Sequence, residues 1–190
     1  KSPDKLWVQG YLNENAAPLD LTNKSLLIDG KYALFADYIK SVEVYKCPED
    51  RVRFEINPDL TYIKVSKVRS YGLNWNLGWI TFYGVQPKET PYYKPNEIQN
   101  PSSVISFIDT NPRSVCWPFF GLYEPKTVFM FPTSHHNRRG TVSFFDAHVE
   151  IKKWTDDRTV STEKSFKSWH SHNYLCPGNY DLLWLMNRMK

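Results

Sequence analysis

The residues best suited to chemistry gather in one stretch of the sequence, which contains Ser134, His135, His136, Asn137, Asp146 and His148. Imidazole and carboxylate groups are ligands that zinc, manganese and iron accept. Asp109 offers a further carboxylate if the fold brings it close. The residue types therefore raise two related hypotheses: a metal site made by His136, Asp146 and Asp109, and a metal-dependent hydrolase that uses His135, His136, Asp146 and His148.

The spacing of these residues matches none of the strong signatures of metal or nucleophile sites. The chain has no H-E-x-x-H pair, and Ser134 lacks the G-x-S-x-G context of a nucleophile elbow. Gly72 and Gly78 are too far apart to open a phosphate-binding loop. A hydrogen bond between His136 and a carboxylate, which pins the loop to the end of a sheet, is the simpler interpretation. It makes His136 and Asp146 structural and predicts no catalytic residue, no metal and no cofactor.

The three cysteines, Cys47, Cys116 and Cys176, are 69 and 60 residues apart. This spacing excludes C-x-x-C zinc and thioredoxin-type motifs and allows at most one disulfide bond. The simplest interpretation is three small, buried, hydrophobic side chains. Cys116, between Val115 and Trp117, is typical of a strand in the core rather than of an activated thiolate.

Aromatic residues are abundant, with 7 Trp and 12 Tyr in 190 residues. Flat rings in irregular segments form stacking platforms on sugar-binding surfaces and are also enriched in protein interfaces. A carbohydrate-binding or adhesive module with a glycan ligand is therefore a further hypothesis. The alternative is that these rings cap the sheet beneath long loops. The candidate ligand surface contains Trp75, Trp79, Tyr83, Tyr92 and Tyr93.

Composition and charge describe an ordinary globular chain. Hydrophobic residues make up 41% and charged residues 23%, which excludes a disordered or disulfide-dense protein. The net charge of +4 is divided as +2 for residues 1–95 and +2 for residues 96–190, which argues against a nucleic-acid-binding face. The longest apolar run, Leu182 to Met186, is far shorter than the ~20 residues of a membrane span. Without a linker or repeat, residues 1–190 are predicted to form a single domain.

Short helices are predicted at the two ends of the chain and strands between them. Helical periodicity occurs at 18–27, at 32–39 and at 180–189. Alternating patterns predict strands at 53–55, 62–69, 104–108, 114–117 and 126–131. The segment 70–79 is rich in turn residues, and the four prolines of 83–101 predict an irregular surface excursion.

The clearest local pattern is a β-hairpin formed by 141–145 and 148–154, joined by a two-residue loop, Asp146-Ala147. In that register Phe144 faces Val149 and Val142 faces Ile151, so the four apolar side chains share one face of the sheet. Together the elements predict an α+β fold with a central antiparallel β-sheet, short helices at both ends and long irregular loops.

Five segments in order carry a resemblance to a known family. They are residues 38–41, 44–50, 70–74 and 104–109, and His136 followed after nine residues by Asp146-Ala147-His148-Val149. Over residues 32–154 the chain resembles the type IV pilin-like proteins, or type II secretion pseudopilins, that carry an H-x9-D-G motif. The positions matching the family pattern are Cys47, Pro48, Asp50, Tyr71, Asn74, Asp109, His136, Asp146, Ala147 and His148.

The resemblance implies a non-enzymatic structural subunit of a secretion or pilus-type filament. Family members begin with a basic leader, which a prepilin peptidase cleaves, followed by a long hydrophobic helix that anchors the subunit in the inner membrane. This chain resembles the soluble head without that helix, facing the periplasm or the exterior. The implied partners are other pilin-like subunits, secretion-system components and the membrane, and not nucleic acid.

Two details of the resemblance bear on the site. The motif glycine is Ala147 here, and alanine costs about 1 kcal/mol if the family turn needs a positive φ at this position. Some pseudopilins bind calcium in a C-terminal loop. The corresponding oxygens here, from Asn173, Asn179 and Asp181, carry too little charge to define a calcium site.

Overall fold

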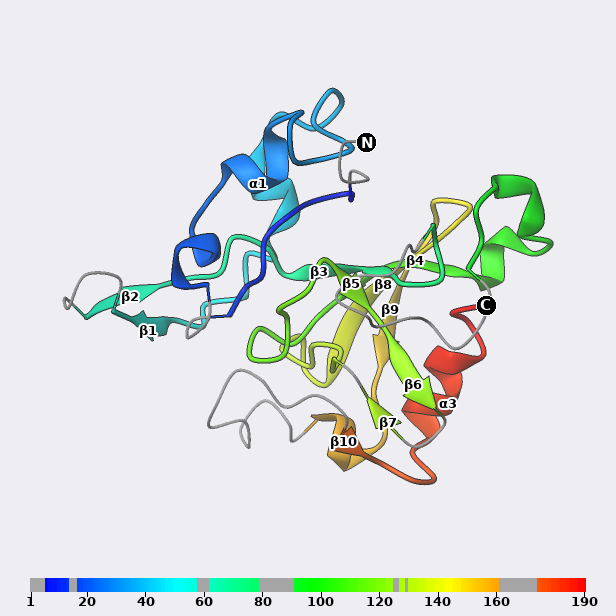
Figure 1. Ribbon diagram of the computed structural model, residues 1–190. Coiled ribbons are helices and arrows are strands. Elements are labelled where there is room, and N and C mark those ends of the chain that lie inside the picture. The colour runs from blue at the N-terminus through cyan, green and yellow to red at the C-terminus, as the bar shows by residue number, and fades with distance from the viewer. Residues whose placement is uncertain are drawn as a thin grey trace.

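A five-stranded sheet forms the centre of the protein (Figure 1). The computed structural model describes residues 6–13, 17–57, 62–78, 91–124, 127–128, 130–160 and 174–190. Within these ranges the α+β class with little helix is confirmed. The strands are β1 (Phe54–Ile56), β2 (Ile63–Val65), β3 (Tyr71–Asn74), β4 (Ile105–Asp109), β5 (Phe119–Phe120), β6 (Leu122–Glu124), β7 (Thr127–Val128), β8 (Arg139–Phe144), β9 (Val149–Lys153) and β10 (Tyr174–Leu175). The helices with defined bounds are α1 (Ser25–Ile28), α3 (Tyr180–Met186) and the 3₁₀ turns Pro18–Leu21, Val42–Tyr45, Pro95–Glu97 and Pro101–Ser103.

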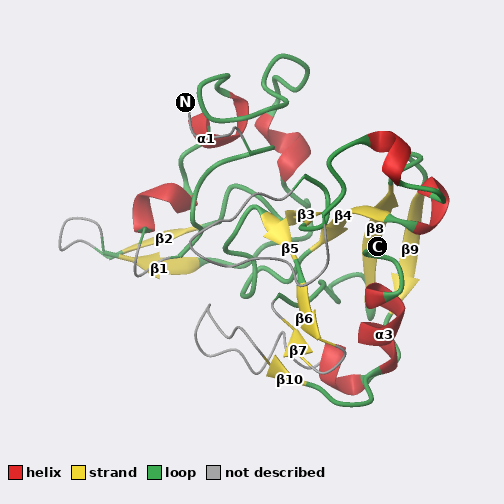
Figure 2. Cartoon of the chain, turned by 45° about the vertical axis from the view of Figure 1, so that its right-hand side comes forward, coloured by secondary structure: helices red, strands yellow, loops and turns green. Residues whose placement is uncertain are grey.

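The central sheet has the strand order β5-β3-β4-β8-β9. Its pairs are antiparallel from β3 to β9, whereas β3 and β5 are parallel. The expected antiparallel central sheet is therefore present, with one parallel pair added at the β5 edge. Two smaller sheets flank it, the β1-β2 hairpin and the three-stranded β10-β7-β6 sheet (Figure 2).

The two faces of the central sheet are covered by different parts of the chain. The N-terminal segment covers one face, where the packed side chains include Trp7, Val8, Leu27, Tyr45, Tyr71, Leu73 and Phe107. The opposite face packs against α3 and neighbouring segments, with a core that includes Val142, Phe144, Trp154, Leu182 and Leu185. In Figure 1 the N-terminal segment lies at the top and α3 at the lower right. The sheet is thus buried between two apolar clusters.

The segment 70–79 contains the central strand β3 and is not only the turn-rich segment that its glycines and aromatic residues predict. Gly72 fits this place because β5 runs beside it: a Cβ atom on Gly72 would lie 3.1 Å from the backbone nitrogen of Phe120. Glycine in a strand often marks such a close approach of another backbone. Asn74 Nδ2 donates to the carbonyl oxygens of Ile105 and Met189, at 2.8 and 2.9 Å. Asn74 therefore links β3 to β4 and to the C-terminal end.

The helix predicted at 32–39 is wrong, because this segment forms a series of turns. Phe35 and Ile39 still pack against the N-terminal cluster, whereas Leu34 and Tyr38 are exposed. The helix predicted at 18–27 is divided into a 3₁₀ turn and α1. Short helices pay a high nucleation cost, so tertiary contacts decide which turns form.

The strand predicted at 114–117 is also wrong. The carbonyl oxygens of Cys116 and Trp117 accept hydrogen bonds from the buried Arg69 guanidinium, at 2.9 and 2.8 Å. The predicted strand at 62–69 shrinks to β2, and within the described residues of 126–131 the strand is β7. Cys116 is fully buried, as predicted, but in a loop that holds a buried cation.

The predicted hairpin is present, but its register differs by one residue. Ser143 pairs with Val149 and Thr141 with Ile151, and Phe144 N donates to His148 O at 2.9 Å. The loop therefore has three residues, 145–147, rather than two. A slip of one residue reverses the face of every side chain. Val142 and Phe144 are buried, whereas Val149 and Ile151 are 59% and 70% exposed on the other face of the edge strand β9.

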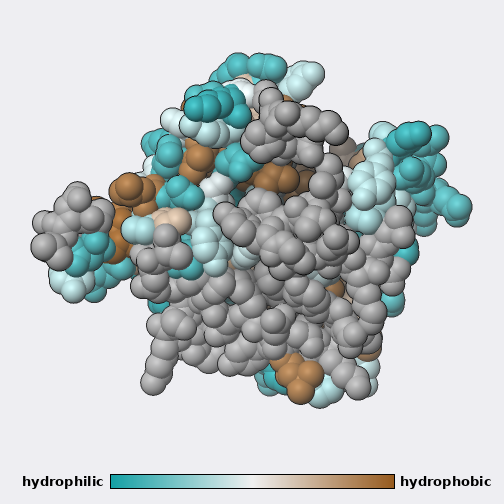
Figure 3. Space-filling model, viewed as in Figure 1, coloured by the Kyte–Doolittle hydropathy of each residue, from teal (hydrophilic) through white to brown (hydrophobic). Residues whose placement is uncertain are grey.

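Exposed apolar side chains are scattered over the described surface. Figure 3 shows apolar atoms along the β1-β2 hairpin, where Ile63 is 42% exposed. Val149 and Ile151 form a second apolar strip on β9. No helix in the described part of the chain has the length and apolar content to cross a bilayer.

Candidate functional site

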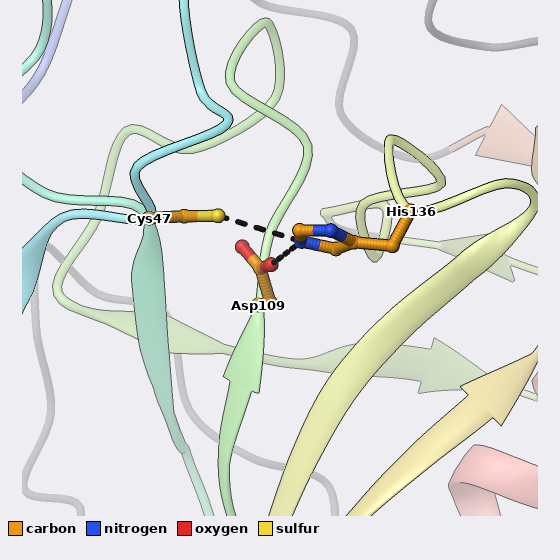
Figure 4. A group of neighbouring side chains, drawn as sticks. All are labelled: Cys47, Asp109 and His136. Carbon is orange, nitrogen blue, oxygen red and sulfur yellow. Dashed lines mark hydrogen bonds and ion pairs between the residues drawn. The ribbon is translucent and has the colours of Figure 1, made fainter.

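Three side chains from distant parts of the sequence meet at one end of the central sheet (Figure 4). Asp109 is the last residue of β4, Cys47 follows the 3₁₀ turn Val42–Tyr45, and His136 lies in the loop before β8. His136 Nε2 is 3.4 Å from Asp109 Oδ2 and 3.4 Å from Cys47 Sγ. The three donor atoms all lie within 4.8 Å of one another.

The Cys47-Pro48-Glu49-Asp50 sequence folds as a tight turn that presents the thiol. Asp50 N donates to Cys47 O at 3.0 Å, and Pro48 occupies the position where a β-turn favours proline. Cys47 N donates to Ser70 Oγ at 3.1 Å, and Ser70 Oγ donates to Asp50 Oδ2 at 2.8 Å. Lys46 forms an ion pair with the same carboxylate. The buried Asp50 therefore fixes the turn to the residue that precedes β3.

The loop that carries His136 is held in an uncommon backbone conformation. Asn137 and Arg138 have φ values of 54° and 61°, in the left-handed region that non-glycine residues seldom adopt. Arg138 N donates to Ser134 O at 3.0 Å, and Thr133 N donates to Asp109 O at 2.9 Å. The loop is thus attached to the end of β4 directly beside the Asp109 side chain. Strained backbone of this kind clusters at functional sites, where the surrounding structure maintains it.

The electrostatic environment of the cluster is negative and buried. Cys47, Asp50 and Asp109 are each at most 5% exposed. Burial raises the pKa of the Cys47 thiol, and the nearby carboxylates of Asp109 and Asp50 raise it further. Burial followed by the charge of Asp109 also raises the pKa of Tyr71 to about 12. Positive charge near these groups is therefore favourable.

The arrangement does not have the geometry of a cysteine nucleophile. In a Cys-His-Asp triad the thiol and the carboxylate contact opposite nitrogens of the imidazole ring. Here both Cys47 and Asp109 contact Nε2 of His136. The raised pKa of Cys47 also disfavours the reactive thiolate. Convergence of three donor groups on one point is instead the arrangement of a ligand set for a cation.

The metal site predicted from His136, Asp109 and Asp146 is assembled only in part. His136 and Asp109 meet, but Asp146 lies at the far end of β8, a strand that spans about 20 Å at ~3.3 Å per residue. The carboxylate that holds the His136 loop to the sheet is thus Asp109.

Asp146 instead pairs with His148 at the tip of the β8-β9 hairpin. Asp146 Oδ1 lies 2.6 Å from His148 Nδ1. The hydrogen bond lowers the pKa of Asp146 and raises that of His148. The hydrolase set of His135, His136, Asp146 and His148 therefore does not form one site.

Ala147 has a φ of 73°, the positive value at which a motif glycine is favourable. Ala147 N donates to Phe144 O at 3.0 Å, which closes the turn. A type I turn followed by a left-handed residue is a standard three-residue hairpin loop. The turn keeps this conformation with alanine at the strained position.

The aromatic residues proposed as a glycan surface do not all face solvent. Trp75 is 4% exposed and stacks on Phe119, with ring centroids 6.4 Å apart. Tyr93 is 60% exposed, and Tyr92 is half-buried beside it. Trp79 and Tyr83 lie outside the described residues. Trp75 therefore belongs to the core, and glycan binding by the other rings stays a prediction.

The oxygens proposed for calcium are occupied by protein hydrogen bonds. Asn179 Oδ1 accepts from the backbone nitrogens of Asp181 and Leu182 and begins helix α3. The buried Asp181 carboxylate accepts from the backbone nitrogens of Thr155 and Asp156. Asn173 lies outside the described residues. Asn179 thus caps the helix N-terminus, and Asp181 ties the helix to the segment that follows β9.

Sequence reasoning placed Cys47 in a motif but missed its contact with His136, 89 residues away. The available signal was the joint presence of the Cys47-Pro48 turn, Asp109 and His136 in one family-like order. All three cysteines are free thiols, and all are buried.

In comparisons with protein-family models, curated proteins and solved structures, nothing matches this chain. The functional proposal therefore depends on the geometry of the site.

Proposed function

We propose that this chain is the head domain of a pilin-like structural subunit of a type II secretion or type IV pilus-like filament. The observation that supports this most directly is the convergence of the motif segments. Cys47, Asp109 and His136 belong to segments that carry the family resemblance and lie together at one end of the central sheet, where Tyr71 pairs with Asp109 across β3 and β4. Their proximity supports a shared role in the fold.

The contacts of the individual side chains support a structural role. Asp50 binds Lys46 and Ser70, and Asn74 joins β3 to β4 and to the C-terminal end. Such bonds hold one chain segment to another. They are what a rigid head needs when it is displayed on a filament.

Assembly then divides between two parts of the subunit. A hydrophobic helix encoded before Lys1 supplies membrane anchoring and axial packing. The head, in the periplasm or outside the cell, supplies lateral contacts with other subunits and with secretion components. The exposed side chains of Val149 and Ile151 on the edge strand β9 are suited to such contacts.

The decisive experiment is to determine the complete reading frame upstream of Lys1 and to express it with a prepilin peptidase. We expect a short basic leader followed by about 20 apolar residues, cleavage after the leader, and retention of the product in the membrane. A gene that begins at this point contradicts the proposal. So does an export signal that is cleaved without a retained apolar helix.

A further inference from the structure

We propose that Cys47, Asp109 and His136 bind a zinc ion. This inference does not depend on the filament proposal, since it rests on the geometry of three side chains. It differs from the sets suggested by local sequence, because it includes Cys47 and excludes Asp146 and His148.

The distances fit tetrahedral coordination. Zinc lies about 2.3 Å from a thiolate sulfur and about 2.0–2.2 Å from imidazole nitrogen or carboxylate oxygen, which places neighbouring ligand atoms about 3.3–3.6 Å apart. His136 Nε2 lies 3.4 Å from Cys47 Sγ and 3.4 Å from Asp109 Oδ2. The third edge, between Cys47 Sγ and the Asp109 carboxylate, is within 4.8 Å. This edge has to shorten to about 3.5 Å when zinc binds.

Hydrogen bonding alone accounts poorly for the same arrangement. A neutral imidazole nitrogen is either a donor or an acceptor, and here one nitrogen of His136 faces two groups. The 3.4 Å distance to Asp109 also exceeds the usual 2.7–3.2 Å range of an N–H···O hydrogen bond. One cation between the three groups satisfies all of them at once.

The chemistry of the donor set selects the metal. Thiolate and imidazole are ligands of zinc, whereas calcium and magnesium take oxygen ligands. Three protein ligands leave a fourth position for water. The buried Asp109 carboxylate supplies a negative charge beside the thiol and the imidazole, which favours a divalent cation, whereas the charge of Asp50 is paired with Lys46.

The backbone holds each ligand before a metal arrives. Ser70 fixes the nitrogen of Cys47, strand β4 fixes Asp109, and the left-handed pair Asn137-Arg138 fixes the loop of His136. Asp109 also lines a pocket of about 280 Å³ on the N-terminal face, together with Tyr71. Zinc bound here would join three chain segments that lie up to 89 residues apart.

The test begins with the purified chain, stripped with a chelator and titrated with zinc against a competing chromogenic chelator. We expect saturation at one zinc ion per chain. Cobalt is then used in place of zinc, and the sulfur-to-cobalt charge-transfer absorption reports coordination by a thiolate. Cys47→Ser abolishes this absorption, and His136→Gln lowers zinc affinity at least about 100-fold, because loss of a direct ligand exceeds the 10–100-fold cost of an outer-shell change.

Matched controls separate the site from general effects of substitution. Cys176→Ser changes another buried thiol, and His148→Gln changes a histidine that also faces a carboxylate. Both should keep wild-type zinc affinity and the cobalt spectrum. If Cys47→Ser does not fold, His136→Gln decides alone, since its side chain is 32% exposed and tolerates exchange. Absence of saturable binding, a cobalt spectrum without thiolate absorption, or equal loss in the control variants overturns the proposal.

Discussion

The described part of the chain contains two histidine–aspartate pairs, one largely buried and one exposed. His136 and Asp109 are 27 residues apart in sequence, and the Asp109 side chain is 3% exposed. His148 and Asp146 are two residues apart at a hairpin tip, and both side chains are more than one third exposed. The residue types are the same, so the difference lies in burial and in what each pair connects.

Asp146 and His148 lie close together because the hairpin turn brings residues two positions apart into contact. Forming the Asp146–His148 pair fixes few further residues, and water screens the two charges. Such exposed pairs therefore contribute little to the free energy of unfolding. The buried pair joins the end of β4 to the loop before β8 and reaches Cys47 as well. It stabilises the fold by fixing distant segments, and its carboxylate is shielded from bulk water.

The largest expected effect distinguishes the two carboxylates. Asp109→Ala should lower the free energy of unfolding by about 2–3 kcal/mol, because it removes a buried charged acceptor and the partner of His136. Asp146→Ala should have a much smaller effect. Urea unfolding in the presence of a chelator measures both without a contribution from metal. Equal losses in the two variants would show that burial does not separate the pairs.

The two histidines provide the next comparison. His136→Ala removes contacts to Cys47 and Asp109 and should lower stability by about 1–2 kcal/mol, or roughly 2–4 °C of melting temperature per kcal/mol. His148→Ala should lower the melting temperature less. Calorimetry of metal-free protein is the measurement. An unchanged melting temperature for His136→Ala, together with loss of bound metal in the loaded protein, would contradict a structural role for this residue.

The hairpin that carries the exposed pair stores backbone strain. Ala147→Gly should raise the stability by roughly 0.5–1 kcal/mol, because glycine relieves the positive φ while it increases the entropy of the unfolded chain. Gly178→Ala is the matched reverse change: φ is 68°, and no other atom lies within 4 Å of the added Cβ. It should destabilise the protein. Thermal unfolding of both variants tests the sign, and a loss of stability in Ala147→Gly would refute the strain argument.

The smallest expected effect is the pH dependence of the exposed pair. Hydrogen bonding to Asp146 raises the pKa of His148, so its contribution is full below the ordinary value of 6.5 and is lost as pH rises through the higher folded value. The pKa of Asp146 is lowered, so its contribution is present above the ordinary 3.8 and is lost as pH falls through the lower folded value. The difference in melting temperature between wild type and His148→Gln should therefore decline as the solution becomes alkaline. A difference that grows with pH would exclude this coupling.

Local pattern identified several elements correctly. The alternation near β4, β8 and β9 and the apolar stripe of α3 predict these elements to within a few residues. The hairpin register was wrong because the loop has three residues rather than two, and Ala147 accepts a conformation that its residue type disfavours. Period-2 patterns place a strand, but the turn decides which face is buried.

The candidate site was predictable only as a set of motif positions. The chemistry of Asp109 and His136 groups these two residues, but local pattern predicts Cys47 as a buried core residue and places Asp146 in the site, whereas Cys47 meets them and Asp146 pairs with His148. Nothing in local spacing says that a turn at residue 47 reaches a loop at residue 136. That contact depends on the order of β3, β4 and β8 in the sheet.

The amino-acid sequence by itself determined the α+β class, the places of β4, β8 and β9 and the C-terminal helix, because these depend on periodicity and on residues close in the chain. Only the tertiary structure decided that Val149 and Ile151 face outward, that Trp75 is buried, and that Cys47, Asp109 and His136 meet. These outcomes depend on strand register and on which segments cover each face. Both are set by the packing of the whole chain rather than by neighbouring residues.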